Sequence, residues 1–210
     1  MLNAFEQLVK SYRANLCQHT QKQKIYLEEL ESSPQRPEAM LISCCDSRVN
    51  PTDLLKAEPG DLFVVRNIAA IVPPFEANSP PNSTAAALEF GVCGLGVKHI
   101  ILMGHSQCGG IKKVLAQKTD TAFIDPWINL LNKNSRFEKK TKSKVPPYST
   151  PFINECAQEA LHVSYENSLT FPFIKEKVEK NLLCIHRWFF NIKTSTIFAY
   201  KNDSSAYEPL

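Results

Sequence analysis

KHIILMGHSQCGG, residues 98–110, joins a short apolar run to a cluster of polar residues and glycines. The apolar half indicates a buried β-strand, and the glycines after it permit a tight turn. AMLISCCDSR, residues 39–48, has the same form. Two buried strands that each end in a polar cluster predict a parallel sheet with its functional residues at the carboxyl ends of the strands.

The flanking sequence alternates between strand and helix patterns, which is typical of an α/β fold. A proline-rich stretch over 73–82 predicts a loop, and Ser83 or Thr84 can cap the helix that follows it. We expect a central, mostly parallel β-sheet flanked by helices, with an antiparallel addition at the C-terminus. Further strands are predicted over 61–66, 182–192 and 196–200, and further helices over 51–57, 84–97 and from 109 onward.

Residues 2–31 predict an amphipathic helical arm outside the sheet pattern. Apolar residues follow a helical period there, with one polar break, and Pro34 and Pro37 end the arm. We expect a single domain over 1–210, consisting of an N-terminal helical arm at 1–33 and an α/β core at 34–210.

The charge of the chain is too small to indicate a nucleic-acid partner. The net charge is +3 and the pI is about 8.4. The positive excess is local and only one aromatic residue, Phe137, lies among the basic residues, so we expect a solvated loop there. No apolar run approaches the roughly 20 residues that cross a bilayer, so no membrane insertion is expected. The clustered basic residues are Lys133, Arg136, Lys139, Lys140, Lys142 and Lys144.

Seven cysteines are an odd number in a chain large enough to fold without disulfides. Glu6 and Lys10 interrupt the apolar run that a signal peptide needs, so we expect a cytoplasmic protein. In a reducing compartment, clustered thiols indicate metal binding or catalysis.

The two polar clusters together offer a metal-ligand set of two thiols and one imidazole: Cys44, His105 and Cys108. Zinc sites with three protein ligands leave the fourth position to water and are catalytic rather than structural. Cys45 competes with Cys44, but side chains alternate along a strand. We expect Cys45 to point away from the site and to pack in the interior.

Asp46 and Arg48 are two residues apart after the first strand and can form a pair. The arginine would hold the carboxylate ionised and oriented beside a metal. Other cysteines and histidines lack ligand spacing. We expect ordinary buried thiols at Cys17, Cys93, Cys156 and Cys184, a surface or structural contact for His99, and no site role for His19, His162 or His186.

C-x-D-S-R followed by G-H-S-x-C-G-G resembles the signature of the β-class carbonic anhydrases, and the plant-like branch fits best. PGDLFVVRNIAAIVPP (59–74), STAAALEFGVCGLGVKHIILMGHSQCGGI (83–111) and HRWFFNIKTSTIFAY (186–200) are similar to blocks of that family. The resemblance covers most of the chain from about residue 35.

The resemblance implies roles for individual residues. Cys44, His105 and Cys108 would bind one zinc ion per subunit, with Asp46 and Arg48 as the catalytic dyad. Gln35 would hydrogen-bond substrate. Phe63 stands where plant-like members place a phenylalanine on the cleft wall. Apart from the resemblance, Val65 and Phe90 are candidates for the same apolar substrate pocket, although Phe90 stands where plant-like members have tyrosine.

The implied function is reversible hydration of carbon dioxide to bicarbonate and a proton, by attack of zinc-bound hydroxide. The family also implies a homodimer or higher homo-oligomer, with N-terminal helices that reach across to a neighbouring subunit. Two alternatives stay open: a carbon disulfide or carbonyl sulfide hydrolase on the same site, and a non-catalytic zinc or redox module. Whether Asp46 can replace water on zinc also stays open.

Overall fold

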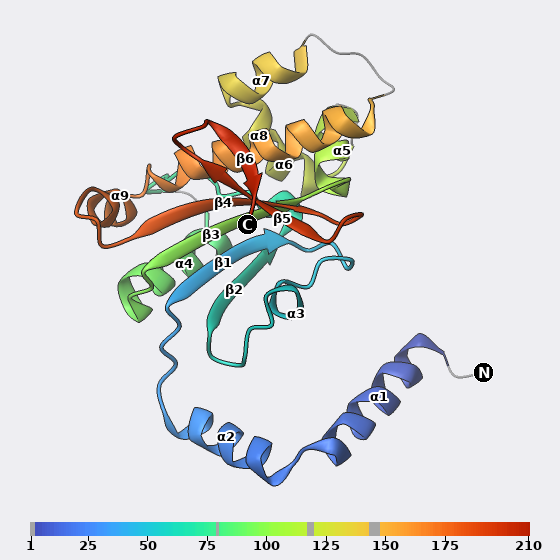
Figure 1. Ribbon diagram of the computed structural model, residues 1–210. Coiled ribbons are helices and arrows are strands. Elements are labelled where there is room, and N and C mark those ends of the chain that lie inside the picture. The colour runs from blue at the N-terminus through green and yellow to red at the C-terminus, as the bar shows by residue number, and fades with distance from the viewer. Residues whose placement is uncertain (1–2, 79, 117–119, 143–147) are drawn as a thin grey trace. The chain divides into compact units, whose positions relative to one another are not determined.

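The computed structural model describes residues 3–78, 80–116, 120–142 and 148–210. The chain forms two compact units, Met1–Gln35 and Arg36–Leu210 (Figure 1). The boundary lies two residues after the predicted end of the helical arm.

The first unit consists of two helices, α1 (Ala4–Gln18) and α2 (Gln21–Ser32), in place of one continuous helix. Each helix begins at a capping box, formed by Asn3 with Glu6 in α1 and by Thr20 with Gln23 in α2. Neither helix has a buried residue, so this unit contains no apolar core of its own.

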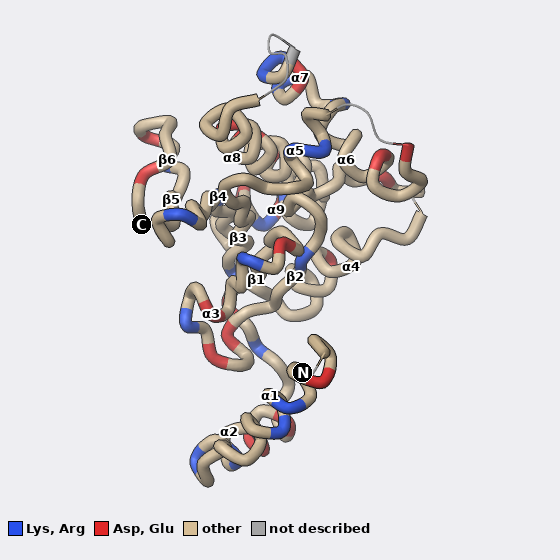
Figure 2. The backbone as a smooth tube through the Cα atoms, turned by 90° about the vertical axis from the view of Figure 1, so that its right-hand side faces the viewer, with Lys and Arg blue, Asp and Glu red and all other residues tan. Residues whose placement is uncertain are grey.

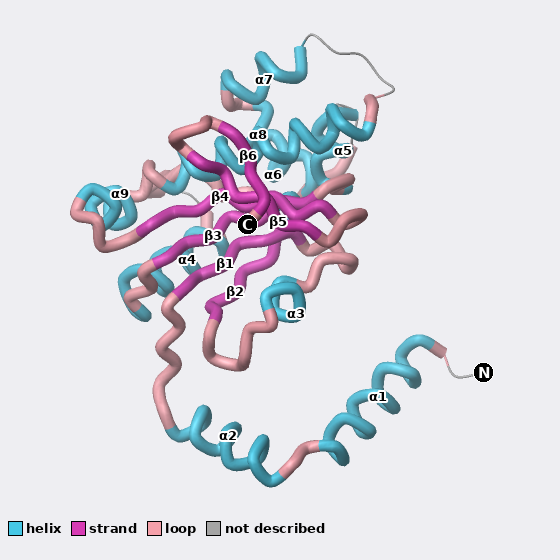
Figure 3. The backbone as a smooth tube through the Cα atoms, in the orientation of Figure 1, coloured by secondary structure: helices cyan, strands magenta, loops and turns pink. Residues whose placement is uncertain are grey.

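The second unit contains a six-stranded sheet of order β2-β1-β3-β4-β5-β6, which forms one continuous layer in Figure 3. The first four strands in this order run parallel, and β5 and β6 are antiparallel additions. The predicted α/β fold class is therefore confirmed. The strands are β1 (Ala39–Cys44), β2 (Leu62–Asn67), β3 (His99–His105), β4 (Cys184–Asn191), β5 (Thr196–Lys201) and β6 (Ala206–Pro209).

The apolar runs of β1 and β3 form the centre of the sheet. Met40, Ile42, Ile100 and Leu102 are fully buried on one face, where they join the larger apolar cluster. The long helix α8 (Thr150–Ser168) packs on that face against β3 and β4. Side chains of opposite parity join a smaller cluster, which α3 (Pro51–Leu55) covers.

The remaining helices connect and cover the strands. They are η1 (Ile68–Ala70), α4 (Ser83–Glu89), η2 (Phe90–Leu95), α5 (Gly109–Ala116), α6 (Ile124–Asn132), α7 (Ser135–Lys142) and α9 (Pro172–Glu179). Asn82 caps α4, so the predicted cap at Ser83 or Thr84 was wrong by one or two residues. Strand β6 was not predicted, because its sequence is short and lacks an apolar alternation.

The basic stretch is largely helical, so the predicted solvated loop was wrong for the described part. In α7, Arg136 pairs with Glu159 and Lys140 with Glu155, both on α8. Lys144 lies outside the described residues. Acidic residues lie among the basic ones along the backbone (Figure 2), in agreement with the small net charge. Among the helices of the described ranges, none has the length and apolarity to cross a membrane.

Candidate metal centre

The two polar clusters meet at the carboxyl edge of the sheet. Strand β1 ends at Cys44 and the neighbouring strand β3 ends at His105. The two strands pair in parallel, with Ser43 opposite Met103, so both ends lie at one edge. A tight turn after His105 then brings Cys108 back to the same place at the start of α5.

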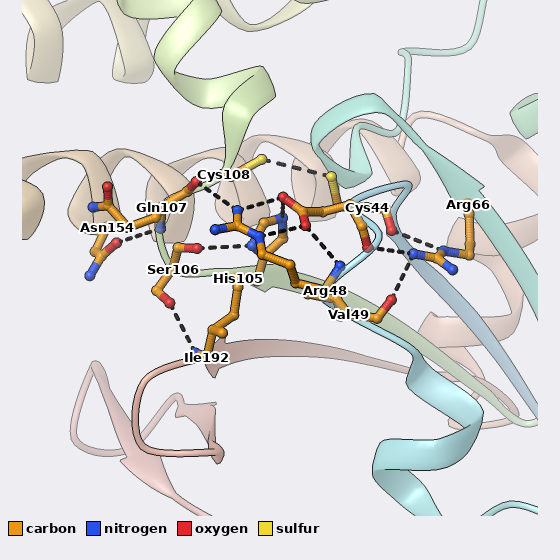
Figure 4. A network of polar contacts seen from close by, with 11 residues as sticks. Cys44, Arg48, Val49, Arg66, His105, Ser106, Gln107, Cys108, Asn154 and Ile192 are labelled. Carbon is orange, nitrogen blue, oxygen red and sulfur yellow. Dashed lines mark hydrogen bonds and ion pairs between the residues drawn. The ribbon is translucent and has the colours of Figure 1, made fainter. Parts of the chain in front are cut away.

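Cys44, His105 and Cys108 form one buried group whose ligand atoms all lie within 4.8 Å of one another. The two Sγ atoms are 3.8 Å apart (Figure 4). Two sulfurs at about 2.3 Å from a tetrahedral zinc ion are separated by about 3.8 Å. The spacing of the thiols therefore fits a zinc ion without rearrangement.

The ring of His105 is oriented for metal binding by its own backbone neighbour. Its Nδ1 lies 2.9 Å from the carbonyl oxygen of Ser106, which can only accept, so Nδ1 carries the proton. Nε2 then has a free lone pair. This atom is buried and has no hydrogen-bond partner among the described residues. A buried nitrogen that has a free lone pair and lies beside two thiols fits the role of a metal ligand.

The two thiols are hydrogen-bonded to each other, with their sulfurs 3.8 Å apart. This bond lowers the pKa of Cys44, and the same bond, together with burial, raises the pKa of Cys108. A thiolate at Cys44 would be largely buried and would need a cationic partner. A bound divalent metal supplies one.

Asp46 lies beside this group and is held in place by Arg48. Both carboxylate oxygens accept from the guanidinium, at 2.9 Å from Nε and 2.7 Å from Nη2. The backbone N–H of Arg48 also donates to Asp46, at 3.0 Å. These bonds hold the pKa of Asp46 well below its usual range. Its Oδ2 lies 3.8 Å from Nε2 of His105, so the ionised carboxylate faces the metal group.

Arg66 supports the loop that carries Cys44 and Asp46, and sequence reasoning gave it no role. Its guanidinium donates to three backbone carbonyls, those of Cys44 (3.0 Å), Asp46 (2.8 Å) and Val49 (2.7 Å), as Figure 4 shows. The only sign of this role in the sequence was the position of Arg66, near the carboxyl end of an apolar strand. Its partners are backbone atoms, which no sequence pattern reveals.

The loop between β3 and α5, which carries Cys108, is held by hydrogen bonds from two sides. The backbone N–H of Gln107, a residue at φ +55°, donates to the side chain of Asn154 on α8 at 3.0 Å. The hydroxyl of Ser106 accepts from the backbone N–H of Ile192 at 2.9 Å. Arg48 also donates to the carbonyl of Gln107, at 3.4 Å, which joins the two loops.

A left-handed turn after β2 completes the wall of the site. Ala69 and Ala70 have φ of 64° and 55°, a conformation that costs non-glycine residues about 1–2 kcal/mol each. The turn presents the backbone N–H of Ala69 to the Cys44 thiolate. It also approaches Gly110, where an added Cβ would lie 2.9 Å from side-chain carbons of Ile68 and Ala69.

The predicted pocket residues lie on neighbouring elements. Phe63 and Val65 are half-buried on β2, and both pack against the larger apolar cluster. Phe90 is 52% exposed, and its ring centroid lies 5.8 Å from that of Phe63. Substrate contact by these three residues stays a prediction. Gln35 is exposed and belongs to the first unit, so its role also stays a prediction.

Several expectations for single cysteines were wrong. Cys45 is not part of the metal-ligand group, as expected, but it is exposed instead of packed in the interior. Cys156 is buried as expected, whereas Cys17, Cys93 and Cys184 are exposed. Apolar neighbours in sequence had suggested burial, but these positions face outward on helix and strand surfaces.

Comparisons with known proteins agree with this arrangement. The family model described as carbonic anhydrase matches residues 39–197. The chain is 34% identical over 189 residues to β-carbonic anhydrase 5, chloroplastic, of Arabidopsis thaliana, which covers 86% of this chain and 62% of that protein. It is 32% identical over 192 residues to the carbonic anhydrase of Helicobacter pylori, which covers 88% of this chain and 85% of that protein.

Solved structures show the same fold. The β-carbonic anhydrase CcaA superposes with a TM-score of 0.90 at 25% identity, over 99% of this chain and 100% of that chain. A structure from work on two tetrameric β-carbonic anhydrases of Sordaria macrospora superposes with a TM-score of 0.81 at 30% identity. The match covers 94% of this chain and 97% of that chain. The ligand group, the family match and these relatives lead to one conclusion: the chain belongs to the β-carbonic anhydrase family.

Proposed function

We propose that this protein catalyses the reversible hydration of carbon dioxide to bicarbonate and a proton. The observation that carries the proposal is a buried group of two thiols and one imidazole with an oriented, ionised carboxylate beside it. A purely structural zinc site closes with four protein ligands. The described residues supply three, and an aspartate–arginine pair stands beside them.

Cys44, His105 and Cys108 would hold the zinc ion. Zinc, when bound, supplies a Lewis acid that makes water a competent nucleophile near neutral pH. The chain supplies the fixed positions of the ligands, through the Ser106 carbonyl at His105 and the Arg66 bonds at the Cys44 loop.

Asp46 would orient the attacking water. Ionised and held by Arg48, it accepts a hydrogen bond and directs a lone pair of the water oxygen at the carbon of the substrate. Both of its oxygens are engaged by Arg48 in this structure. This pairing supports an arrangement in which Asp46 stays off the metal, because ligation would require breaking it.

Phe63, Val65 and Phe90 would provide an apolar wall for the nonpolar substrate, and Gln35 would donate a hydrogen bond to bicarbonate. Assembly into a homo-oligomer is part of the proposal. The apolar side chains of α1 and α2 are exposed in the single chain, and the Sordaria relatives are described as tetrameric. A cytoplasmic location is also proposed, because an odd number of cysteines with two of them in a metal-ligand group is typical of a reducing compartment.

The deciding experiment is stopped-flow carbon dioxide hydration on wild type and Asp46→Asn, with zinc content measured in both. We expect activity in wild type and a large loss in the variant at unchanged zinc content. Asp46→Asn keeps the size of the side chain and removes its charge, so retained zinc separates a catalytic defect from a lost metal. A zinc-loaded wild type without hydration activity would refute the proposal.

A further inference from the structure

A pair of histidines lies at the opposite, amino edge of the same sheet. His99 opens β3, and His186 lies near the start of the neighbouring strand β4. Nδ1 of His99 and Nε2 of His186 are 3.2 Å apart, and the ring centroids are 5.2 Å apart. The pair is remote from the metal centre, because β3 runs seven residues from His99 to His105, a span of about 20 Å.

The strand register places both imidazoles on one face. His99 pairs with Cys184 in the parallel ladder, and His186 lies two residues further along β4. Residues two apart on a strand share a face. In Figure 1, β3 and β4 run side by side from this edge. The two rings therefore meet through the backbone arrangement and not through a chance rotamer of one long side chain.

The nitrogen spacing matches that of two metal ligands. Two imidazole nitrogens at about 2.0–2.1 Å from a tetrahedral zinc ion are about 3.3 Å apart. In the metal-free pair, one nitrogen donates a hydrogen bond to the other. A neutral imidazole can shift its proton to the other ring nitrogen without changing charge. Both facing atoms can thus become lone-pair donors while both rings stay neutral.

Access and protonation both permit binding. His99 is exposed and His186 is half-buried, so an ion can approach from solvent. Burial lowers the pKa of His186, and His99 and Lys201 lower it further. A lowered pKa favours the neutral imidazole, which is the form that binds a metal.

We propose that His99 and His186 form a second metal site, specific for borderline divalent transition metals such as Zn²⁺, Ni²⁺ and Cu²⁺. Imidazole suits these ions, whereas Mg²⁺ and Ca²⁺ require oxygen ligands. Water completes the coordination. With two ligands and an exposed position, this site binds more weakly than the buried centre. The inference does not depend on the hydration activity.

Isothermal titration of Ni²⁺ into tag-free, zinc-loaded full-length protein tests the site. We expect one additional Ni²⁺ per chain in wild type. Binding should weaken at least tenfold in His99→Ala and in His186→Ala. His19→Ala, a histidine in the first unit, is the matched control and should bind as wild type does. Mg²⁺ should give no heat of binding.

A second measurement on unmodified protein guards against folding defects in the variants. Ni²⁺ is paramagnetic in water-completed sites, so it should broaden the imidazole NMR signals of His99 and His186 before those of other histidines. A zinc-loaded wild type that takes up no further Ni²⁺ would overturn the proposal. Unchanged binding in both alanine variants would do the same, leaving the pair as a hydrogen-bonded contact.

Discussion

Strand β3 carries a histidine at each end, and the two stand in contrasting surroundings. His105 is 1% exposed, its Nδ1 is bonded to the Ser106 carbonyl, and two thiols converge on its Nε2. His99 is exposed, and its side chain contacts another imidazole, that of His186. An imidazole is thus part of a buried metal centre at the carboxyl edge, where hydrogen bonds hold it in place. At the amino edge an imidazole is part of a solvent-accessible pair.

The comparison shows that burial and fixed neighbouring groups determine how tightly a histidine can bind a metal. The imidazole itself is the same at both edges. At the carboxyl edge, Arg66, Arg48 and Asn154 hold the loops before any metal arrives. Metal binding at this edge then requires no ordering of flexible loops. The low dielectric of the buried centre also strengthens each interaction between the metal and its ligands. At the amino edge His99 is exposed and His186 is half-buried, so we expect a bound ion to exchange with solvent more readily there.

Removing a thiol should produce the largest effect, because it breaks the three-ligand group itself. We expect Cys44→Ser and Cys108→Ser each to weaken zinc binding by more than the ~100-fold that loss of a residue supporting a ligand costs. Zinc content after dialysis against a chelator measures this. Cys45→Ser is the matched control, since Cys45 is exposed, and should keep its zinc. Equal zinc loss in Cys45→Ser would show that the ligand had been misassigned.

His162 shows a third environment, in which a buried histidine serves the fold. It lies on α8 against Tyr200, with its Nδ1 2.8 Å from Arg187 Nη1. Burial, followed by Arg187 and Arg136, lowers its pKa from 6.5 to about 4. The unfolded chain therefore binds the proton more readily, and stability falls as pH drops from 6.5 towards 4.

The size of this acid effect is at most about 3 kcal/mol, from 1.36 kcal/mol per pKa unit. Denaturant unfolding at pH 7 and pH 4 measures it. We expect His162→Gln, which keeps an acceptor for Arg187, to lose less stability over this range than wild type does. His19→Gln, at a histidine of the first unit, is the control and should follow wild type. An identical pH dependence in wild type and His162→Gln would contradict the assignment.

Arg66→Ala should weaken metal binding at the carboxyl edge of the sheet and leave metal binding at the amino edge unchanged. It leaves the carbonyls of Cys44, Asp46 and Val49 without their donor, so the loop loosens. We expect zinc affinity at the carboxyl edge to fall ~10–100-fold. Nickel binding at His99 and His186 should be unchanged, because the hydrogen bonds of Arg66 within the described part of the chain all go to the Cys44–Val49 loop. Zinc affinity equal to that of wild type would show that Arg66 is not needed to position the ligands.

The smallest expected effect concerns two adjacent glycines. Gly110→Ala places a Cβ 2.9 Å from Ile68 Cγ2 and Ala69 Cβ, whereas a Cβ at Gly109 meets nothing within 4 Å. Ile68 is exposed and its side chain can shift, but the Cβ of Ala69 can move only with its backbone, so we expect Gly110→Ala to cost about 1–2 kcal/mol of unfolding free energy. Gly109→Ala should be neutral or slightly stabilising. Equal unfolding free energies for the two variants would contradict the close packing.

The strands and the metal ligands could be predicted because both leave local signals. AMLIS and KHIILM are uninterrupted apolar runs, and each is followed at once by its ligand residues. Parallel pairing then brings Cys44 and His105 to one edge. The dyad was also predictable, since Asp46 and Arg48 are two residues apart.

The remaining features depend on contacts that sequence spacing does not encode. Arg66 acts on backbone carbonyls, and Asn154 reaches the Gln107 loop from 47 residues away. The His99–His186 pair spans 87 residues, so neither member showed ligand spacing. Burial of single cysteines was predicted wrongly because neighbouring residues do not reveal which face a side chain takes.

X-ray absorption at the zinc edge of the purified protein tests the carboxyl-edge centre most directly. We predict a first coordination sphere with two sulfurs at about 2.3 Å and imidazole nitrogen at about 2.0–2.1 Å. Cys108→Ser, if reloaded with zinc, should lose one of the two sulfurs. A sphere of nitrogen and oxygen alone would contradict the assignment of Cys44, His105 and Cys108 as the metal ligands.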